Sequence, residues 1–154
     1  MAGRVMQHPA RILVPVTDSP ASLAAVGTAC LAARASRAEV LALHVIEVVR
    51  SLPLNSPVEE EALRGERVLR QAEEAARAVN YQLKGDLVQA RAAGQAIVDE
   101  AAERQVDTII LGVGYKRLIG AFQAGRTADY ILRNAGCEVW VVRQALKAEE
   151  PGRR

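Results

Sequence analysis

The sequence contains few aromatic residues, although it is rich in aliphatic ones. Aromatic side chains make up 3% of the 154 residues, while 50% of the residues are hydrophobic. The core must therefore be built from Ala, Val, Leu and Ile, which favours helices packed on a parallel sheet over an all-β fold. The length predicts a single domain over residues 1–154, with its core at about residues 11–143 and short flexible ends.

Cysteine, histidine, unbalanced charge and long apolar runs are also scarce. Cys30 and Cys137 form no Cys-x-x-Cys pair and few histidines accompany them, so we expect no metal site and interpret both as small core residues. The 20 basic and 18 acidic residues are interleaved, which argues against a nucleic-acid partner. No apolar run approaches the roughly 20 residues of a membrane span, and the N-terminus lacks a secretory signal. We therefore expect no membrane insertion and a cytoplasmic location.

Apolar runs alternate with amphipathic segments along the chain. Helical periodicity follows the capping residue Ser19, covers about Val58–Asn80 and Gly94–Arg104, and resumes after Gly125, and the charges of the long second helix are expected to face solvent. The expected strands, in chain order, are Arg11–Val16, Glu39–Glu47, Tyr81–Val88, Asp107–Leu111 and Glu138–Arg143.

This order of elements predicts an α/β fold. Strands that alternate with helices form right-handed crossovers, and we expect a doubly wound, five-stranded parallel sheet with strand order 3-2-1-4-5 and helices on both faces. Tyr81–Val88 alternates apolar and polar residues, as expected for a strand at the sheet edge. Ligands of such sheets bind where the order reverses, which is between Pro15–Asp18 and Gly112–Tyr115. A helix that begins near Gly125 would attract anions to the same place.

Four segments of the sequence resemble the universal stress protein family. They occur in the same order as in that family, and the resemblance covers nearly the whole chain, from about Arg11 to Arg143. It implies a single UspA-like domain with the fold of the adenine-nucleotide alpha hydrolases, which agrees with the predicted topology. The four segments are Arg11–Val16, Glu39–Glu47, Val106–Gly112 and Ala128–Val142.

The resemblance extends to a degenerate ATP-binding motif. The nucleotide-binding branch of the family carries Gly-x2-Gly-x9-Gly-Ser/Thr, whose backbone amides and hydroxyl group hold the ATP phosphates. Gly112 and Gly125 match the first and third glycines, whereas Tyr115 stands at the second glycine and Arg126 at the hydroxyl position. Two interpretations follow: a site for an adenine nucleotide or another anion, with charge-assisted phosphate contacts, or a loop that closes the fold and binds nothing.

The family also implies contacts outside this motif. Its first loop contacts the nucleoside through an aspartate, which is Thr17 here, and its adenine lies between positions that match Pro15 and Val45. His44 is interpreted as a core or strand-end histidine. The candidate nucleotide-binding residues are Pro15, Thr17, Val45, Gly112, Gly114, Gly125, Arg126 and Thr127, with Lys116 and Arg117 as additional phosphate contacts.

Two functions from different classes are consistent with these residues. The first is a small cytoplasmic stress-response regulator that binds an adenine nucleotide such as ATP or AMP, or a similar anion, and signals through a homodimer. The second is an interaction protein of the same fold that binds no nucleotide and acts on a transporter or an enzyme through its dimer and surface. An adenylyl transferase is disfavoured because the turn Thr17–Pro20 carries no phosphate-binding signature.

The last strand provides the expected dimer interface. It is predicted to lie at the sheet edge opposite the Tyr81 strand, where a bare apolar edge would be an aggregation hazard. In the family this strand pairs with its own copy across a two-fold axis. No Ser-His-Asp order, metal pair or Walker lysine is present, so we expect no enzyme, with any ATP hydrolysis slow and incidental. The interface residues are Val139, Trp140, Val141 and Val142.

Overall fold

A five-stranded parallel sheet forms the centre of the computed structural model, which describes residues 8–114, 117–118, 121–122 and 125–145. The strand order is β3-β2-β1-β4-β7, and every neighbouring pair is parallel. Because β7 is the fifth strand of this sheet, the predicted order 3-2-1-4-5 is confirmed. The strands are β1 (Arg11–Pro15), β2 (Glu39–Glu47), β3 (Lys84–Ala90), β4 (Thr108–Val113) and β7 (Glu138–Arg143).

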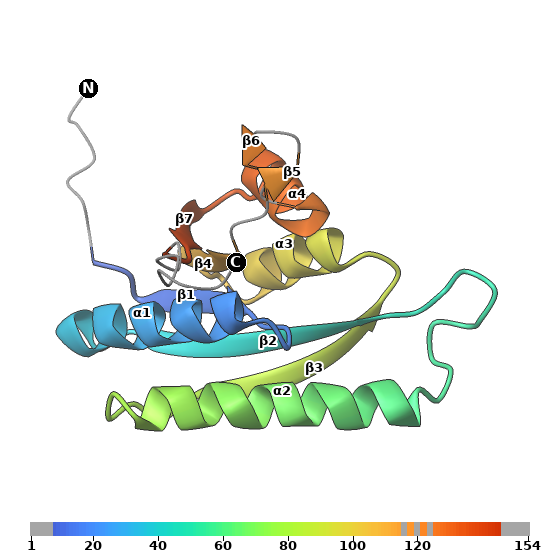
Figure 1. Ribbon diagram of the computed structural model, residues 1–154, viewed down its shortest axis with the longest axis horizontal. Helices are drawn as coiled ribbons and strands as arrows, with labels where there is room; N and C mark the ends of the chain where they lie inside the picture. The colour runs from blue at the N-terminus through green and yellow to red at the C-terminus, as the bar shows by residue number, and fades with distance from the viewer. Residues whose placement is uncertain (1–7, 115–116, 119–120, 123–124, 146–154) are drawn as a thin grey trace, which may run out of the picture.

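Helices cover both faces of the sheet, and alternation along each strand divides the core in two. Figure 1 shows α3 and α4 above the sheet and α2 below it. Ile12 and Val14 of β1 pack with α1 and α2, whereas Leu13 between them packs with α3 and α4. The sheet is therefore buried on both faces, as the continuous apolar runs predicted. The helices are α1 (Pro20–Ser36), α2 (Glu59–Arg77), α3 (Ala93–Glu103) and α4 (Arg126–Asn134).

The first turn of α1 begins as the sequence indicated and packs closely on β4. Ser19 is the N-cap and its hydroxyl oxygen accepts a hydrogen bond from the Ser22 amide at 3.4 Å, while Pro20 occupies the first helical position. A Cβ atom on Gly112 of β4 would lie 2.0 Å from the carbonyl oxygen of Ala21. Gly112 thus permits a backbone-to-backbone approach between α1 and the sheet.

The third strand of the sheet starts later than the sequence predicted. After α2 the chain turns through Asn80, whose φ is 56°, and strand pairing begins only at Lys84. Tyr81 instead uses its hydroxyl group to bond the backbone at the start of β2, donating to the Ala38 carbonyl at 2.8 Å and accepting from the Val40 amide at 3.0 Å. The apolar alternation correctly placed Tyr81 and Leu83 against the core, but Gly85 is exposed, Val88 packs against the core on the other face, and the strand boundary was not located. The position of β3 at the sheet edge is confirmed.

A short hairpin within the loop after β4 was also missed. The antiparallel strands β5 (Arg117–Leu118) and β6 (Ala121–Phe122) lie between β4 and α4. They are too short to produce a periodic pattern in the sequence. Tyr115 and Lys116, which the motif comparison singled out, lie outside the described residues.

The two cysteines lie on opposite faces of the sheet. Cys30 is buried among the α1 and α2 core residues, and half-buried Cys137 packs against the α3 and α4 core. This confirms Cys30 as a core residue. In the described part of the chain, no His, Cys, Asp and Glu side chains gather in a group of three or more that could hold a metal ion. Nor is any helix there long and apolar enough to cross a membrane.

A candidate ligand cavity at the carboxyl edge of the sheet

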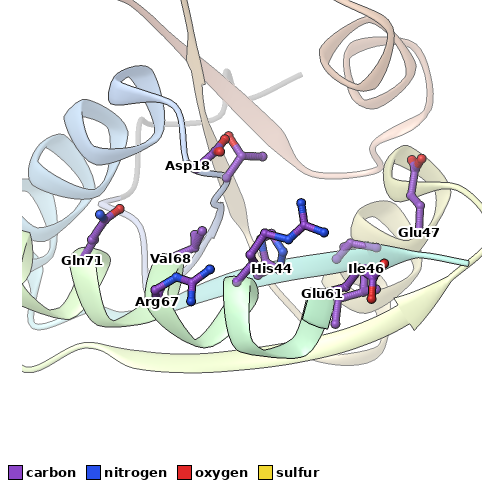
Figure 2. Close-up of a pocket in the computed structure, with 11 residues that line it drawn as sticks. Asp18, His44, Ile46, Glu47, Glu61, Arg67, Val68 and Gln71 are labelled. Atoms are coloured by element: carbon purple, nitrogen blue, oxygen red, sulfur yellow. The ribbon is translucent and has the colours of Figure 1, made fainter. Parts of the chain in front are cut away.

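A cavity of about 410 Å³ opens beside the first half of α2, where β1 and β2 end. Small-molecule sites commonly have volumes of roughly 300–1,000 Å³, and the volume of this cavity lies within that range. Figure 2 shows Asp18 above the helix, with Arg67 and Gln71 on the helix below it. The described lining residues are Thr17 and Asp18 after β1, residues 44–47 at the end of β2, and Glu61, Arg64, Arg67, Val68 and Gln71 of α2.

His44 lies half-buried on the floor of this cavity in a fixed orientation. Its Nδ1 atom is 2.8 Å from the Val16 carbonyl oxygen. A carbonyl oxygen only accepts hydrogen bonds, so Nδ1 carries a proton and donates to it. His44 lies within β2, where it pairs in register with Leu87 of β3. Its place in the cavity lining was not predicted, because α2 lies far from β2 in the sequence.

Gly65 explains how α2 approaches this histidine. A Cβ atom at position 65 would lie 2.8 Å from His44 Cδ2 and 2.6 Å from Leu87 Cδ2, which is closer than side chains normally pack. The glycine therefore brings the helix backbone close to β2 and β3. The two residues that flank this contact on the cavity side, Arg64 and Arg67, are consequently held at a defined height above the sheet.

Thr17 forms the wall of the cavity at the end of β1. Its hydroxyl group donates to Ser19 Oγ at 3.2 Å and lies 3.2 Å from Ser22 Oγ, while its amide donates to Ser22 Oγ at 3.0 Å. This cluster of hydroxyl groups orders the turn into α1. Thr17 therefore stabilises the turn, and Asp18 beside it is exposed and supplies the carboxylate of this wall.

Glu47 lines the far end of the cavity, but its carboxylate is committed to another helix. Its Oε1 atom accepts a hydrogen bond from the Ala93 amide at 2.9 Å, at the N-terminus of α3. Ala92, the N-cap residue, makes no side-chain capping bond, so Glu47 acts as the cap from a neighbouring strand. Figure 2 shows Glu47 beside α3 and away from Arg67.

The polar lining residues of α2 are exposed, as the sequence predicted for the helix charges, yet they also face the cavity. Glu61, Arg64, Arg67 and Gln71 recur at intervals of three and four, so they share one side of the helix. They lie next to the apolar seam that packs on the sheet. A polar stripe bordering such a seam was the signal that could have identified them.

The cavity contains two of the residues that the sequence assigned to nucleotide binding. Thr17 and Val45 line it. The side chains of Lys116 and Arg117 lie outside the described residues. The other candidates are not among the lining residues that the structure describes, and they are Pro15, Gly112, Gly114, Gly125, Arg126 and Thr127.

The structure explains why glycine occurs at two positions of the degenerate motif, and the explanation differs between them. Gly112 is required by the approach of α1, as described above. Gly125 is the N-cap of α4 with a φ of 89°, which favours glycine, and Arg126 and Thr127 then begin the helix. Gly114 faces open space within 4 Å of its Cβ position. The match at Gly112 therefore cannot be read as a phosphate contact alone.

The outer strand β7 carries the residues expected at a dimer interface. It pairs with β4 on one side and is the last strand in the order of the sheet. Val139, Trp140 and Val142 are half-buried, while the Val141 side chain is 44% exposed. Among the described residues no strand pairs with the outer side of β7, where Val141 presents an apolar side chain.

Comparison with known proteins identifies the family. Residues 9–143 match the model of the universal stress protein family, and the chain therefore belongs to this family. Universal stress protein MJ0531 of Methanocaldococcus jannaschii is 27% identical over 143 residues, which cover 89% of this chain and 84% of that protein.

Solved structures share the fold. The universal stress protein from Archaeoglobus fulgidus in complex with dAMP superposes with a TM-score of 0.69 at 19% identity, covering 88% of this chain and 98% of that one. A universal stress protein in complex with cAMP has a TM-score of 0.69 at 22% identity, with 89% and 98% covered. The family's doubly wound sheet, predicted from the sequence segments, is thus confirmed.

Proposed function

We propose that this chain binds an adenine nucleotide at the carboxyl edge of its sheet and passes the occupancy of that site to a protein partner through a homodimer. The observation that carries the proposal is the cavity beside α2, because it lies at this edge and includes Thr17 and Val45. The complexes of two universal stress proteins with cAMP and dAMP support an adenine nucleotide as the ligand class.

The chemistry of the lining suits such a ligand. Val45 offers apolar surface to a base, and the Asp18 carboxylate can accept hydrogen bonds from ribose hydroxyl groups. Arg64 and Arg67 add positive charge on the opposite wall. The role that we propose is binding and regulation, with a transporter or an enzyme in the cytoplasm as the partner, and it includes no catalytic step.

Thermal unfolding in the presence of nucleotides tests this function. A ligand that binds only the folded state at 100 times its Kd adds about 2.7 kcal/mol to the free energy of unfolding. We expect ATP, AMP or cAMP to raise the Tm and UTP to leave it unchanged. If no adenine nucleotide shifts the Tm, or if UTP shifts it equally, adenine-nucleotide binding is wrong.

A second candidate function is favoured by the exposed edge of β7. If the chain acts as an interaction protein without a nucleotide, its activity resides in the dimer that pairs this edge with a second copy. Sedimentation at micromolar concentration should then show a dimer. Val141→Lys should shift it to monomer, since the substitution places a charge at the centre of the edge.

A matched control separates this effect from a general change in charge. Val49 is 61% exposed in the loop after β2, far from β7 in the fold, so Val49→Lys should leave the dimer intact. A wild-type monomer, or equal dissociation by both variants, would rule out the β7 interface.

A further inference from the structure

We infer that Arg64 and Arg67 of α2 hold the phosphate group of the bound nucleotide. The inference rests on the proposed function and deepens it, because it assigns the anion to α2, which lines the cavity, and not to the loop between Gly112 and Gly125 that the family motif implies. In that loop, Arg126 replaces the hydroxyl residue of the family motif and Gly112 is already required by α1 packing. The cavity lining contributed by α2 offers a second set of donors for the phosphate.

The two arginines are available for an external anion. Both line the cavity, and no carboxylate oxygen of the described residues lies within 4.0 Å of either guanidinium group. Arg104, by contrast, contacts Asp86 at 2.6 Å and Glu100 at 2.7 Å. Guanidinium groups bind phosphate through paired, charge-assisted hydrogen bonds, which makes this pair a suitable phosphate clamp.

Negative and positive side chains lie on opposite walls of the cavity, an arrangement that suits a nucleoside phosphate. Asp18 stands on the β1 wall and the arginines stand on the α2 wall. Glu47 is committed to the N-terminus of α3, and Glu61 lies in the first turn of α2, where the helix dipole stabilises a carboxylate. A ligand with hydroxyl groups at one end and an anion at the other could therefore donate hydrogen bonds to Asp18 and bind the two arginines.

The fold also fixes the backbone positions from which the two arginines extend. Arg64 precedes Gly65, the residue that seats α2 against His44, and the His44 ring is fixed by its bond to the Val16 carbonyl oxygen. Groups carried by a seated helix lose less freedom on binding than groups carried by a loop.

Calorimetric titration with AMP and adenosine tests the inference. In the wild type, AMP should bind more tightly than adenosine. Arg64→Gln combined with Arg67→Gln should weaken AMP binding by roughly 10- to 100-fold, the range for loss of hydrogen bonds to a charged group, while adenosine binding stays the same. Arg70→Gln is the matched control, since Arg70 is an exposed arginine of α2 outside the cavity lining, and it should bind AMP as the wild type does.

The outcomes separate failure of the inference from failure of the proposed function. If neither AMP nor adenosine binds the wild type, the adenine-nucleotide function itself is wrong. If AMP binds but the double variant keeps its preference over adenosine, the clamp is wrong. If Arg126→Gln loses the preference for AMP over adenosine and the double variant keeps it, the phosphate binds at the start of α4 and not at α2. Circular dichroism of each variant checks that it is folded.

Discussion

The two faces of the sheet are packed in different ways. On the face covered by α1 and α2, the helices contribute mainly small residues to the core, and Gly112 and Gly65 allow helix backbones to approach the strands. On the face covered by α3 and α4, large aliphatic side chains such as Ile97 and Ile131 fill the space. The small helix residues of the first face are Ala25, Ala29, Cys30, Ala33, Ala72 and Ala76.

On one face close approach fixes where a helix lies, whereas on the other face large side chains fill the core. Where α1 meets β4, the distance between helix and sheet is set by backbone atoms that cannot rotate away. On the same face, α2 forms the cavity wall and packs its Gly65 backbone against the side chains of His44 and Leu87. Where side chains interdigitate, stability depends on volume, and truncation leaves a cavity without moving a helix. Substitutions should therefore destabilise the protein by steric displacement of a helix on the first face and by cavity formation on the second.

The largest effect is expected where α1 meets β4. Gly112→Val places a Cβ atom 2.0 Å from the Ala21 carbonyl oxygen, so α1 must shift away from the sheet. Overpacking usually costs about 1–3 kcal/mol, and we expect more than about 4 kcal/mol here because the obstacle is backbone. Gly114→Ala, two residues along the chain and in open space, should change the stability by less than about 0.5 kcal/mol. Urea unfolding measures both, and equal effects would refute the close approach.

An intermediate effect is expected on the face filled by side chains. Ile131 of α4 is fully buried, and Ile131→Ala should lower the free energy of unfolding by about 3 kcal/mol through lost burial and a cavity. Leu132, its neighbour, is 50% exposed, and Leu132→Ala should cost less than about 1 kcal/mol. Chemical denaturation of the two variants gives the comparison. A small loss for Ile131→Ala would mean that this face is not tightly packed.

The smallest effect is a pH-dependent loss of stability caused by Cys30, one of the small buried residues on the face covered by α1 and α2. Burial raises the pKa of the Cys30 thiol from 9.0 to about 11. Between these values the unfolded chain loses the proton and the folded chain keeps it, so the stabilisation is complete below pH 9 and is lost as the pH rises through 11. Relative to Cys30→Ala, the wild type should lose roughly 2 kcal/mol from pH 9 to 11.

The control for this pH effect is the cysteine on the opposite face. Burial also raises the pKa of Cys137, which is half-buried, but Cys137→Ala should retain the steep decline that Cys30 causes. Stability curves of all three proteins between pH 8 and pH 11 decide the matter. Parallel curves for the wild type and Cys30→Ala would show that the Cys30 thiol ionises freely in the folded protein.

Much of the fold was predictable because its signals are local. The continuous aliphatic runs identified four of the strands of the sheet, and Ser19 with Pro20 located the start of α1, since capping and φ restriction act within a few residues. The start of β3 was misplaced because Tyr81 is held by hydrogen bonds to Ala38 and Val40, which lie about forty positions earlier in the sequence. Pairing partners across such distances leave no periodic signature.

The candidate site was predictable only in part. Thr17 and Val45 could be proposed because they match nucleoside-contact positions of the family, and parallel strands bring the carboxyl ends of β1 and β2 to one edge. Whether the family's glycines still serve a phosphate depended on packing: Gly112 is needed by α1 whatever the ligand. The sequence pattern does not distinguish a glycine required for packing from one required for binding.

The sequence by itself determined the order of strands and helices, the aliphatic core and the membership of the chain in the universal stress protein family, because these depend on local periodicity and on segments read in order. Only the tertiary structure decided that His44, Arg64 and Arg67 share one cavity. The physical reason is the absent side chain at Gly65, which lets α2 settle against β2 and so brings an arginine pair from one segment over a histidine from another.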